Sequence, residues 1–278
     1  MTLLENGRIE RLLRHDGAAV MASVALITLL AWAYLIVLAI DMRAGDMRLM
    51  GMAGGMMDMA PRIIAEPRPW TWITFVLMGL MWWIMMTGMM LPSAAPMILL
   101  FARLQRHKLA DQAPGRRIVL FTLGYLVMWL GFSLAATAAQ WALSALTLLS
   151  PMMKATSPLL AAALFAAAGA YQFTRLKHAC LAHCRAPVHF LTRYWRKGDF
   201  GAFRMGLHHG AYCVGCCWVL MALLFAGGVM NLLWVAAIAL MVLLEKLLPG
   251  GVWLSRASGA AMLGIGAGFA GLAMSSAS

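Results

Sequence analysis

Long apolar stretches limit what this chain can fold into more than any other feature. About seven of them approach or reach the length of about 20 residues that a helix needs to cross a bilayer. They occupy residues 18–40, 70–91, 118–139, 157–173, 210–225, 229–247 and 258–274. Because lipid offers backbone amides no hydrogen-bond partner, such stretches cross membranes as helices. We therefore expect an all-α fold, a polytopic transmembrane helix bundle with about seven spans.

Composition leaves little room for anything besides these spans. Apolar residues make up 63% of the 278 residues and charged residues only 12%, about half the charged share of a soluble protein. We expect one integral membrane domain over residues 1–278, with the first span retained as an uncleaved anchor.

The distribution of basic residues predicts the orientation. Lys and Arg accumulate in cytoplasmic loops, and with the amino terminus inside only a few of the 22 would lie outside: Arg43, Arg48, Arg62, Arg68 and Lys154. We expect the amino terminus in the cytoplasm and the carboxyl terminus outside, in a bacterial inner membrane. This orientation explains the net charge of +12, so a nucleic-acid partner is not needed.

The fifth span begins with a group of metal-ligand side chains, in the sequence GLHHGAYCVGCC from residue 206. His209, Cys213 and Cys216 fall at about 0°, 40° and −20° around a helix, and Cys217 lies about 80° away. Thiolates suit Cu(I), whereas thiolate with imidazole also suits Zn(II). The alternative is that these cysteines pack as small apolar side chains.

The second span carries a stripe of methionines that includes Met85, Met86, Met89 and Met90. Thioethers bind soft ions, although a methionine stripe also serves as packing in a core. Pro92 and Pro96 follow, and we expect them to bend or unwind the helix near the cytoplasmic face.

A second group of ligand types lies in the internal segment 171–210. Cys180 and Cys184 are one helical turn apart, and His183 lies beside them. Their spacing is not that of a zinc ribbon. The segment is therefore either a donor of metal ligands or a solvated basic loop without a ligand role. All five cysteines fall on the expected inner side, where thiols stay reduced.

The expected external loop 41–69 contains a methionine-rich segment at 46–59, with Met47, Met50, Met52, Met56, Met57 and Met59. Exposed thioethers can capture Cu(I) without forming disulfides. The alternative is a flexible or membrane-resting segment whose methionines have no ligand role.

Polar groups in the last two spans suggest structural roles. We expect Asn231 to hydrogen bond between helices and Glu245 to pair with its neighbour Lys246 at the inner interface. The glycines of the span 258–274 predict close helix packing.

Three segments, MMTGMMLPSAAPM, LKHACLAHCRAP and HHGAYCVGCCWVLMALLFAGGVMNLLW, resemble a family of predicted metal-binding integral membrane proteins, the domain of unknown function 2182. The resemblance covers most of residues 70–250. It implies a membrane-embedded metal site at Cys213, Cys216 and Cys217, with the methionines of the second span nearby.

The leading interpretation is a non-enzymatic copper-handling protein. External methionines would collect Cu(I), the second span would offer successive weak sites, and the inner Cys/His group would hold the ion or deliver it to a partner protein. Zinc is the alternative metal, and a membrane metalloenzyme, an enzyme-complex subunit or a metal-free scaffold are the alternative functions. No nucleotide-binding loop or Ser/His/Asp arrangement is apparent, which disfavours ATP-driven pumping and serine hydrolysis.

Overall fold

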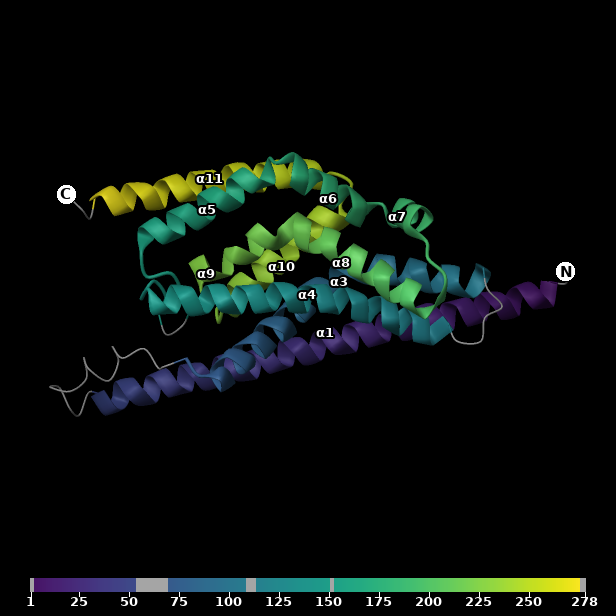
Figure 1. Ribbon diagram of the computed structural model, residues 1–278, viewed down its shortest axis with the longest axis horizontal. Coiled ribbons are helices and arrows are strands. Elements are labelled where there is room, and N and C mark those ends of the chain that lie inside the picture. Colours follow the sequence, from purple (N-terminus) through teal and green to yellow (C-terminus); the bar gives the residue numbers. More distant parts are fainter. Residues whose placement is uncertain (1–2, 54–69, 109–113, 151–152, 276–278) are drawn as a thin grey trace.

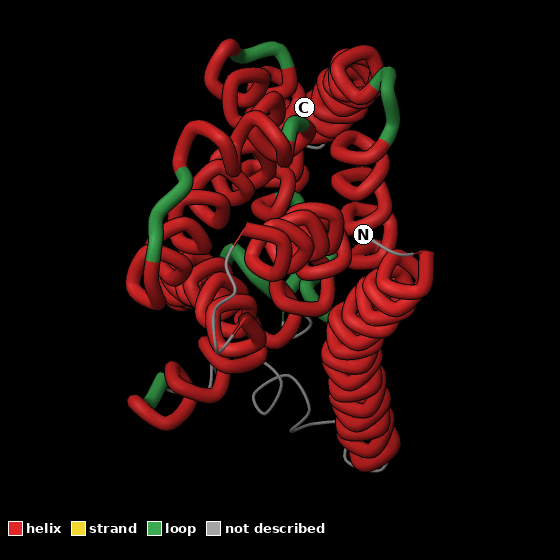
Figure 2. The backbone as a smooth tube through the Cα atoms, turned by 90° about the vertical axis from the view of Figure 1, so that its right-hand side faces the viewer, coloured by secondary structure: helices red, strands yellow, loops and turns green. Residues whose placement is uncertain are grey.

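The computed structural model describes residues 3–53, 70–108, 114–150 and 153–275, with side chains over 17–42, 70–105, 114–150 and 153–275. Within these residues the chain consists of helices joined by short loops (Figure 2), with a single isolated β-bridge between Leu149 and Ala155. The expected all-α fold is therefore confirmed.

The helices follow one another closely along the chain. They are α1 (Leu3–Ala53), α3 (Trp72–Lys108), α4 (Pro114–Ala145), α5 (Pro158–Gln172), α6 (Arg175–Arg185), α7 (Pro187–Tyr194), α8 (Gly198–Ala222), α9 (Leu224–Gly227), α10 (Leu232–Leu247) and α11 (Gly251–Ser275).

The long helices run back and forth along the longest axis of the molecule (Figure 1). The chain starts at one end of this axis, and the C-terminus lies at the opposite end. Helices α5 and α11 lie side by side along one edge and α1 along the other, with α3, α4, α8 and α10 between them.

Five helices are long and apolar enough to cross a membrane, or six if the bent pair α5 and α6 forms one span with its 64° bend. These helices define a multi-pass membrane protein. The expected span 229–247 corresponds to α10, which has only 16 residues and falls short of the usual length of a complete crossing. The expected number of seven spans is thus supported only in its coarser form.

Helices α3 and α8 form the centre of the bundle. In their candidate spans 67% and 61% of the most apolar window is buried, against 22% in α1 and 17% in α11. The outer helices instead expose large apolar side chains such as Leu29 and Trp253, which suits a lipid environment. The two central helices are the ones that carry the methionine stripe and the three buried cysteines.

Glycines allow α8 to pack directly on the backbone of α4. A Cβ atom at Gly206 would collide with the carbonyl oxygen of Phe121, and one at Gly124 would collide with that of Phe203. This close approach places the middle of α8 against Tyr125 of α4. Close packing of the last span is also confirmed, because a Cβ at Gly259 would lie 2.6 Å from Cβ of Gln172 in α5.

The expectations about the loop 41–69, the prolines of α3 and Asn231 have different outcomes. Helix α1 continues through the first part of the expected loop 41–69, and residues 54–69 lie outside the described part of the chain. Helix α3 is not unwound at Pro92 and Pro96. Asn231 links two helices, because its side chain caps the start of α10 by accepting from Trp234 N and donates to the carbonyl of Gly227 at the end of α9.

Candidate metal centre

Three cysteine thiols converge on one turn of α8. Cys213, Cys216 and Cys217 are all at most 1% exposed. The thiols of Cys216 and Cys217 donate to the carbonyl oxygen of Cys213, at 3.1 and 3.0 Å. This local bonding is open to residues three and four positions further along a helix. The three sulfurs are thereby gathered on the inward side of the central helix.

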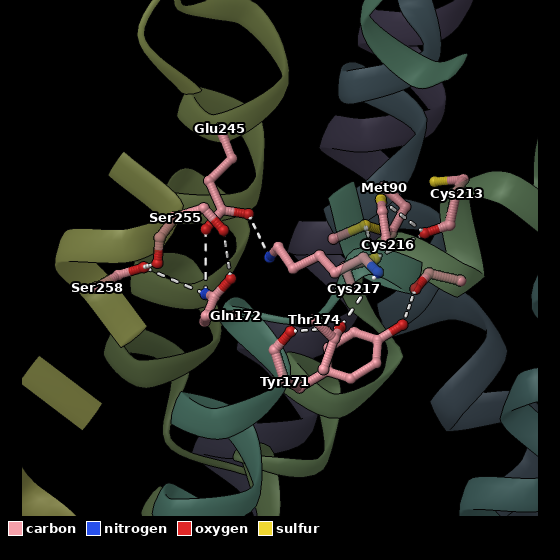
Figure 3. A network of polar contacts seen from close by, with 12 residues as sticks. Met90, Tyr171, Gln172, Thr174, Cys213, Cys216, Cys217, Glu245, Ser255 and Ser258 are labelled. Atoms are coloured by element: carbon pink, nitrogen blue, oxygen red, sulfur yellow. Dashed lines mark hydrogen bonds and ion pairs between the residues drawn. The ribbon is translucent and has the colours of Figure 1, made fainter. Parts of the chain in front are cut away.

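Met90 of α3 approaches this group from the neighbouring helix. Its Sδ atom lies 3.9 Å from Sγ of Cys217, and Figure 3 shows it beside the three cysteines. On the α4 side, the hydroxyl of Tyr125 donates to the carbonyl of Met90 at 3.0 Å and lies 3.2 Å from Sγ of Cys213. Tyr125 thus links the backbone of Met90 to Cys213, and the thioether of Met90 lies against Cys217.

Lys246 of α10 brings a positive charge to the same place. Its Nζ atom lies 2.9 Å from both Sγ of Cys213 and Oγ of Ser93. The residue is only 6% exposed. A buried ammonium is costly unless an anion or several acceptors accompany it, so Cys213 is its natural counter-ion.

Cys184 of α6 completes the group. Its thiol makes hydrogen-bonding contact with the thiols of Cys213 and Cys216, and unlike them it is only half-buried. We use the name cysteine cluster for Cys184, Cys213, Cys216 and Cys217. The cluster extends from the buried centre of the bundle to a residue of intermediate exposure on α6.

Cys180 lies one turn before Cys184 but has a different environment. A Cβ atom on Gly215 would lie 2.8 Å from the Sγ atom of Cys180. The absence of a side chain at Gly215 therefore leaves room for the Cys180 thiol between α6 and α8. The hydroxyl of Tyr171 donates to the carbonyl of the same Gly215. Cys180 therefore belongs to the α6–α8 contact, adjacent to the cluster.

The two histidines proposed from sequence are placed differently. His209 is buried among the rings of Phe121, Tyr125 and Phe190, with centroids 5.5 to 6.2 Å away, and its Nδ1 atom has no hydrogen-bond partner in the structure. His183 stacks on Tyr212 at 4.1 Å and contacts the carbonyl of Ala179 through Nδ1. His209 thus adjoins the cluster, whereas His183 packs on a tyrosine.

The remaining methionines of the proposed set are buried on α3. Met85, Met86 and Met89 are at most 2% exposed, and among the described hydrogen bonds only Met90 on this helix reaches a cysteine thiol. Burial alone does not distinguish a transfer path from packing. Their ligand role stays a prediction.

The expected pairing of Glu245 with Lys246 is wrong. Glu245 instead forms a buried ion pair with Lys177 of α6 at 2.7 Å, supported by Gln172, Ser255 and Ser258 (Figure 3). Successive residues on a helix point about 100° apart, so Glu245 and Lys246 reach different neighbours. This periodicity could have indicated that the two side chains point apart. It does not identify Cys213 and Ser93 as the partners of Lys246.

The described residues contain no group of three or more His, Cys, Asp or Glu side chains already arranged to hold a metal ion. Instead, the thiols of Cys216 and Cys217 donate to the backbone carbonyl of Cys213, and the sulfur of Cys213 accepts from Lys246. A metal would exchange these contacts for sulfur–metal bonds. The thioether of Met90 lies outside that residue set and adds a soft donor.

The fold and the site together indicate a multi-pass helical membrane protein with a buried group of cysteine and methionine sulfur atoms. A family model described as PpoB2, copper chaperone, matches residues 79–269. The match covers more than half of the chain, and the chain belongs to this copper chaperone family. No curated protein and no solved structure matches it.

Proposed function

We propose that this protein is a non-enzymatic membrane copper chaperone that holds Cu(I) at the cysteine cluster and Met90. The observation that carries this proposal is the convergence of sulfur atoms from α3, α6 and α8 in the centre of the bundle. Cysteines that served only as packing would not need a thioether and an ammonium beside them. Membership of the copper chaperone family supports the same metal.

Cu(I) fits this arrangement better than Zn(II). Structural zinc sites use four Cys or His ligands in closed tetrahedral geometry, which leaves no place for a thioether. Cu(I) is a soft ion that thiolate and thioether ligands select. The pairing of Cys217 with Met90 therefore favours copper.

The proposal includes an orientation in the bacterial inner membrane. With the amino terminus in the cytoplasm, the alternating helices of Figure 1 place the start of α8 and the end of α10 on the cytoplasmic side, and α10 would act as a short additional pass. Cys184, the least buried residue of the cluster, would then be the point at which a partner protein receives or supplies copper.

A metalloenzyme is the second candidate, and one contact weighs against it. Such an enzyme usually needs an acid or base near its metal. Glu245 was the only carboxylate within the expected spans, and it is held in an ion pair with Lys177. The contact with Lys177 therefore favours a structural role for Glu245 over that of a catalytic acid or base.

Elemental analysis of the purified protein tests the proposal. Protein from copper-supplemented cells should contain copper, and a variant with serine at Cys213, Cys216 and Cys217 should lose it. Cys180→Ser is the matched control, because it removes a half-buried thiol outside the cluster and should keep the copper content. Undiminished copper in the triple variant would rule out this site, and zinc in place of copper would favour the alternative metal.

A further inference from the structure

The position of Lys246 raises the question of which ionic charge the cluster accepts. Its ammonium lies 2.9 Å from Sγ of Cys213 and interacts electrostatically with the other three cysteines of the cluster. No carboxylate in the described residues forms an ion pair with it, since Glu245 is bound to Lys177. The positive charge of Lys246 thus belongs to the metal centre itself.

Net charge is expensive in a buried site. In a medium of low dielectric constant an uncompensated charge costs far more than in water, so the most stable assembly of ion, thiolates and ammonium is a neutral one. A monovalent ion and one ammonium together require two thiolates. A divalent ion and the same ammonium require three.

The arrangement of the thiols favours the smaller number. Cys216 and Cys217 each donate their thiol proton to the carbonyl of Cys213, and Cys213 is engaged by Lys246. The third thiolate that a divalent ion needs would come at the loss of one of these bonds. The neutral thioether of Met90 can complete the coordination without adding charge.

We propose that Lys246 is a specificity-determining residue that makes the cysteine cluster selective for a soft monovalent ion over a divalent one. This inference rests on the proposed function, namely that the cluster binds metal. It assigns the selectivity to a positive side chain rather than to a ligand. Without that charge, two thiolates and a divalent ion would form the neutral assembly.

The test uses the purified full-length protein in detergent, stripped of metal and titrated with Ag(I) and with Zn(II). Ag(I) serves as a monovalent soft probe that is stable to oxidation. In Lys246→Gln, the ratio of Ag(I) affinity to Zn(II) affinity should fall by at least about tenfold, because one full charge beside the ion is lost. Lys246→Arg keeps the charge and should keep the ratio within about threefold of the wild-type value.

Each outcome is decisive. A lower ratio in Lys246→Gln with a retained ratio in Lys246→Arg supports the inference. If both affinities fall by the same factor, or the ratio rises, Lys246 has only a structural role and the inference is overturned. Wild-type protein that binds neither ion contradicts the proposed function as well. Should Lys246→Gln fail to fold, Lys246→Met removes the same charge in an apolar form and answers the same question.

Discussion

The Sγ atom of Cys217 and the Sδ atom of Met90 face each other across the interface between α8 and α3, 3.9 Å apart. Since a metal–sulfur bond is about 2.3 Å long, two sulfurs at this separation can bind one ion with little movement. Both residues are fully buried. The pair therefore joins the methionine stripe of one central helix to the cysteine cluster of the other.

Met90→Leu should weaken copper binding by about tenfold, about 1.4 kcal/mol, because it removes the thioether and keeps a similar apolar volume. Stability should change by less than about 1.5 kcal/mol. Met97→Leu is the matched control, since Met97 is also buried on α3, about two turns after Met90. Competition with a Cu(I) chelator measures both, and equal affinities in the two variants would remove Met90 from the site.

Gly215→Ala should weaken metal binding although no ligand is removed. The new Cβ atom would lie 2.8 Å from Sγ of Cys180, and we expect α6 to move away from α8 and take Cys184 with it. The substitution itself favours a helix by about 0.8 to 1 kcal/mol, which separates this effect from a loss of helical structure. The reaction of Cys184 with a maleimide should become faster.

Gly131→Ala provides the control for that experiment. Gly131 lies inside α4, and a Cβ atom there would meet nothing within 4 Å. Its metal affinity and maleimide reactivity should match the wild type. If Gly215→Ala behaves in the same way as this control, the position of α6 does not matter for binding.

Glu245→Gln should destabilise the fold by about 3 to 5 kcal/mol. The reason is that the Lys177 side chain, with 0% exposure, would be left buried without its counter-charge. A double variant that also carries Lys177→Met should recover part of the loss. Thermal unfolding in detergent measures this, and an unchanged midpoint for the single variant would show that the pair contributes nothing to stability.

Topology reporters should place residues 150 and 197 on opposite sides of the membrane. Ser150 follows α4 and Lys197 precedes α8, and in Figure 1 these helix ends lie at opposite ends of the bundle. A reporter fused after Ser150 should be external and one fused after Lys197 cytoplasmic. Two reporters in the same compartment would contradict the proposed orientation.

Hydrophobic length and helical periodicity predicted the helices and part of the site. The apolar stretches correspond to the long helices, and His209, Cys213 and Cys216 are buried on one side of α8 as the wheel angles indicated. Hydrophobic length and wheel angles are properties of a single helix. They predict burial because the side of a helix that faces the bundle follows the same period of 3.6 residues.

Contacts between helices were not predictable in the same way. The depth and rotation of α10 relative to α8 decide that Lys246 reaches Cys213, and no pattern within α10 encodes them. Similarly, α6 brings Cys184 to the cluster but directs His183 onto Tyr212. The sequence of α6 alone does not show which of these neighbouring residues faces α8.

X-ray absorption at the copper edge of the copper-loaded protein tests the central claim most directly. The proposal predicts Cu(I) with a first coordination shell of sulfur. In Cys217→Ser that shell should contain fewer sulfur atoms, whereas in Cys180→Ser it should be unchanged. A shell of only nitrogen and oxygen, or a sulfur shell that Cys217→Ser leaves intact, would show that copper is bound elsewhere.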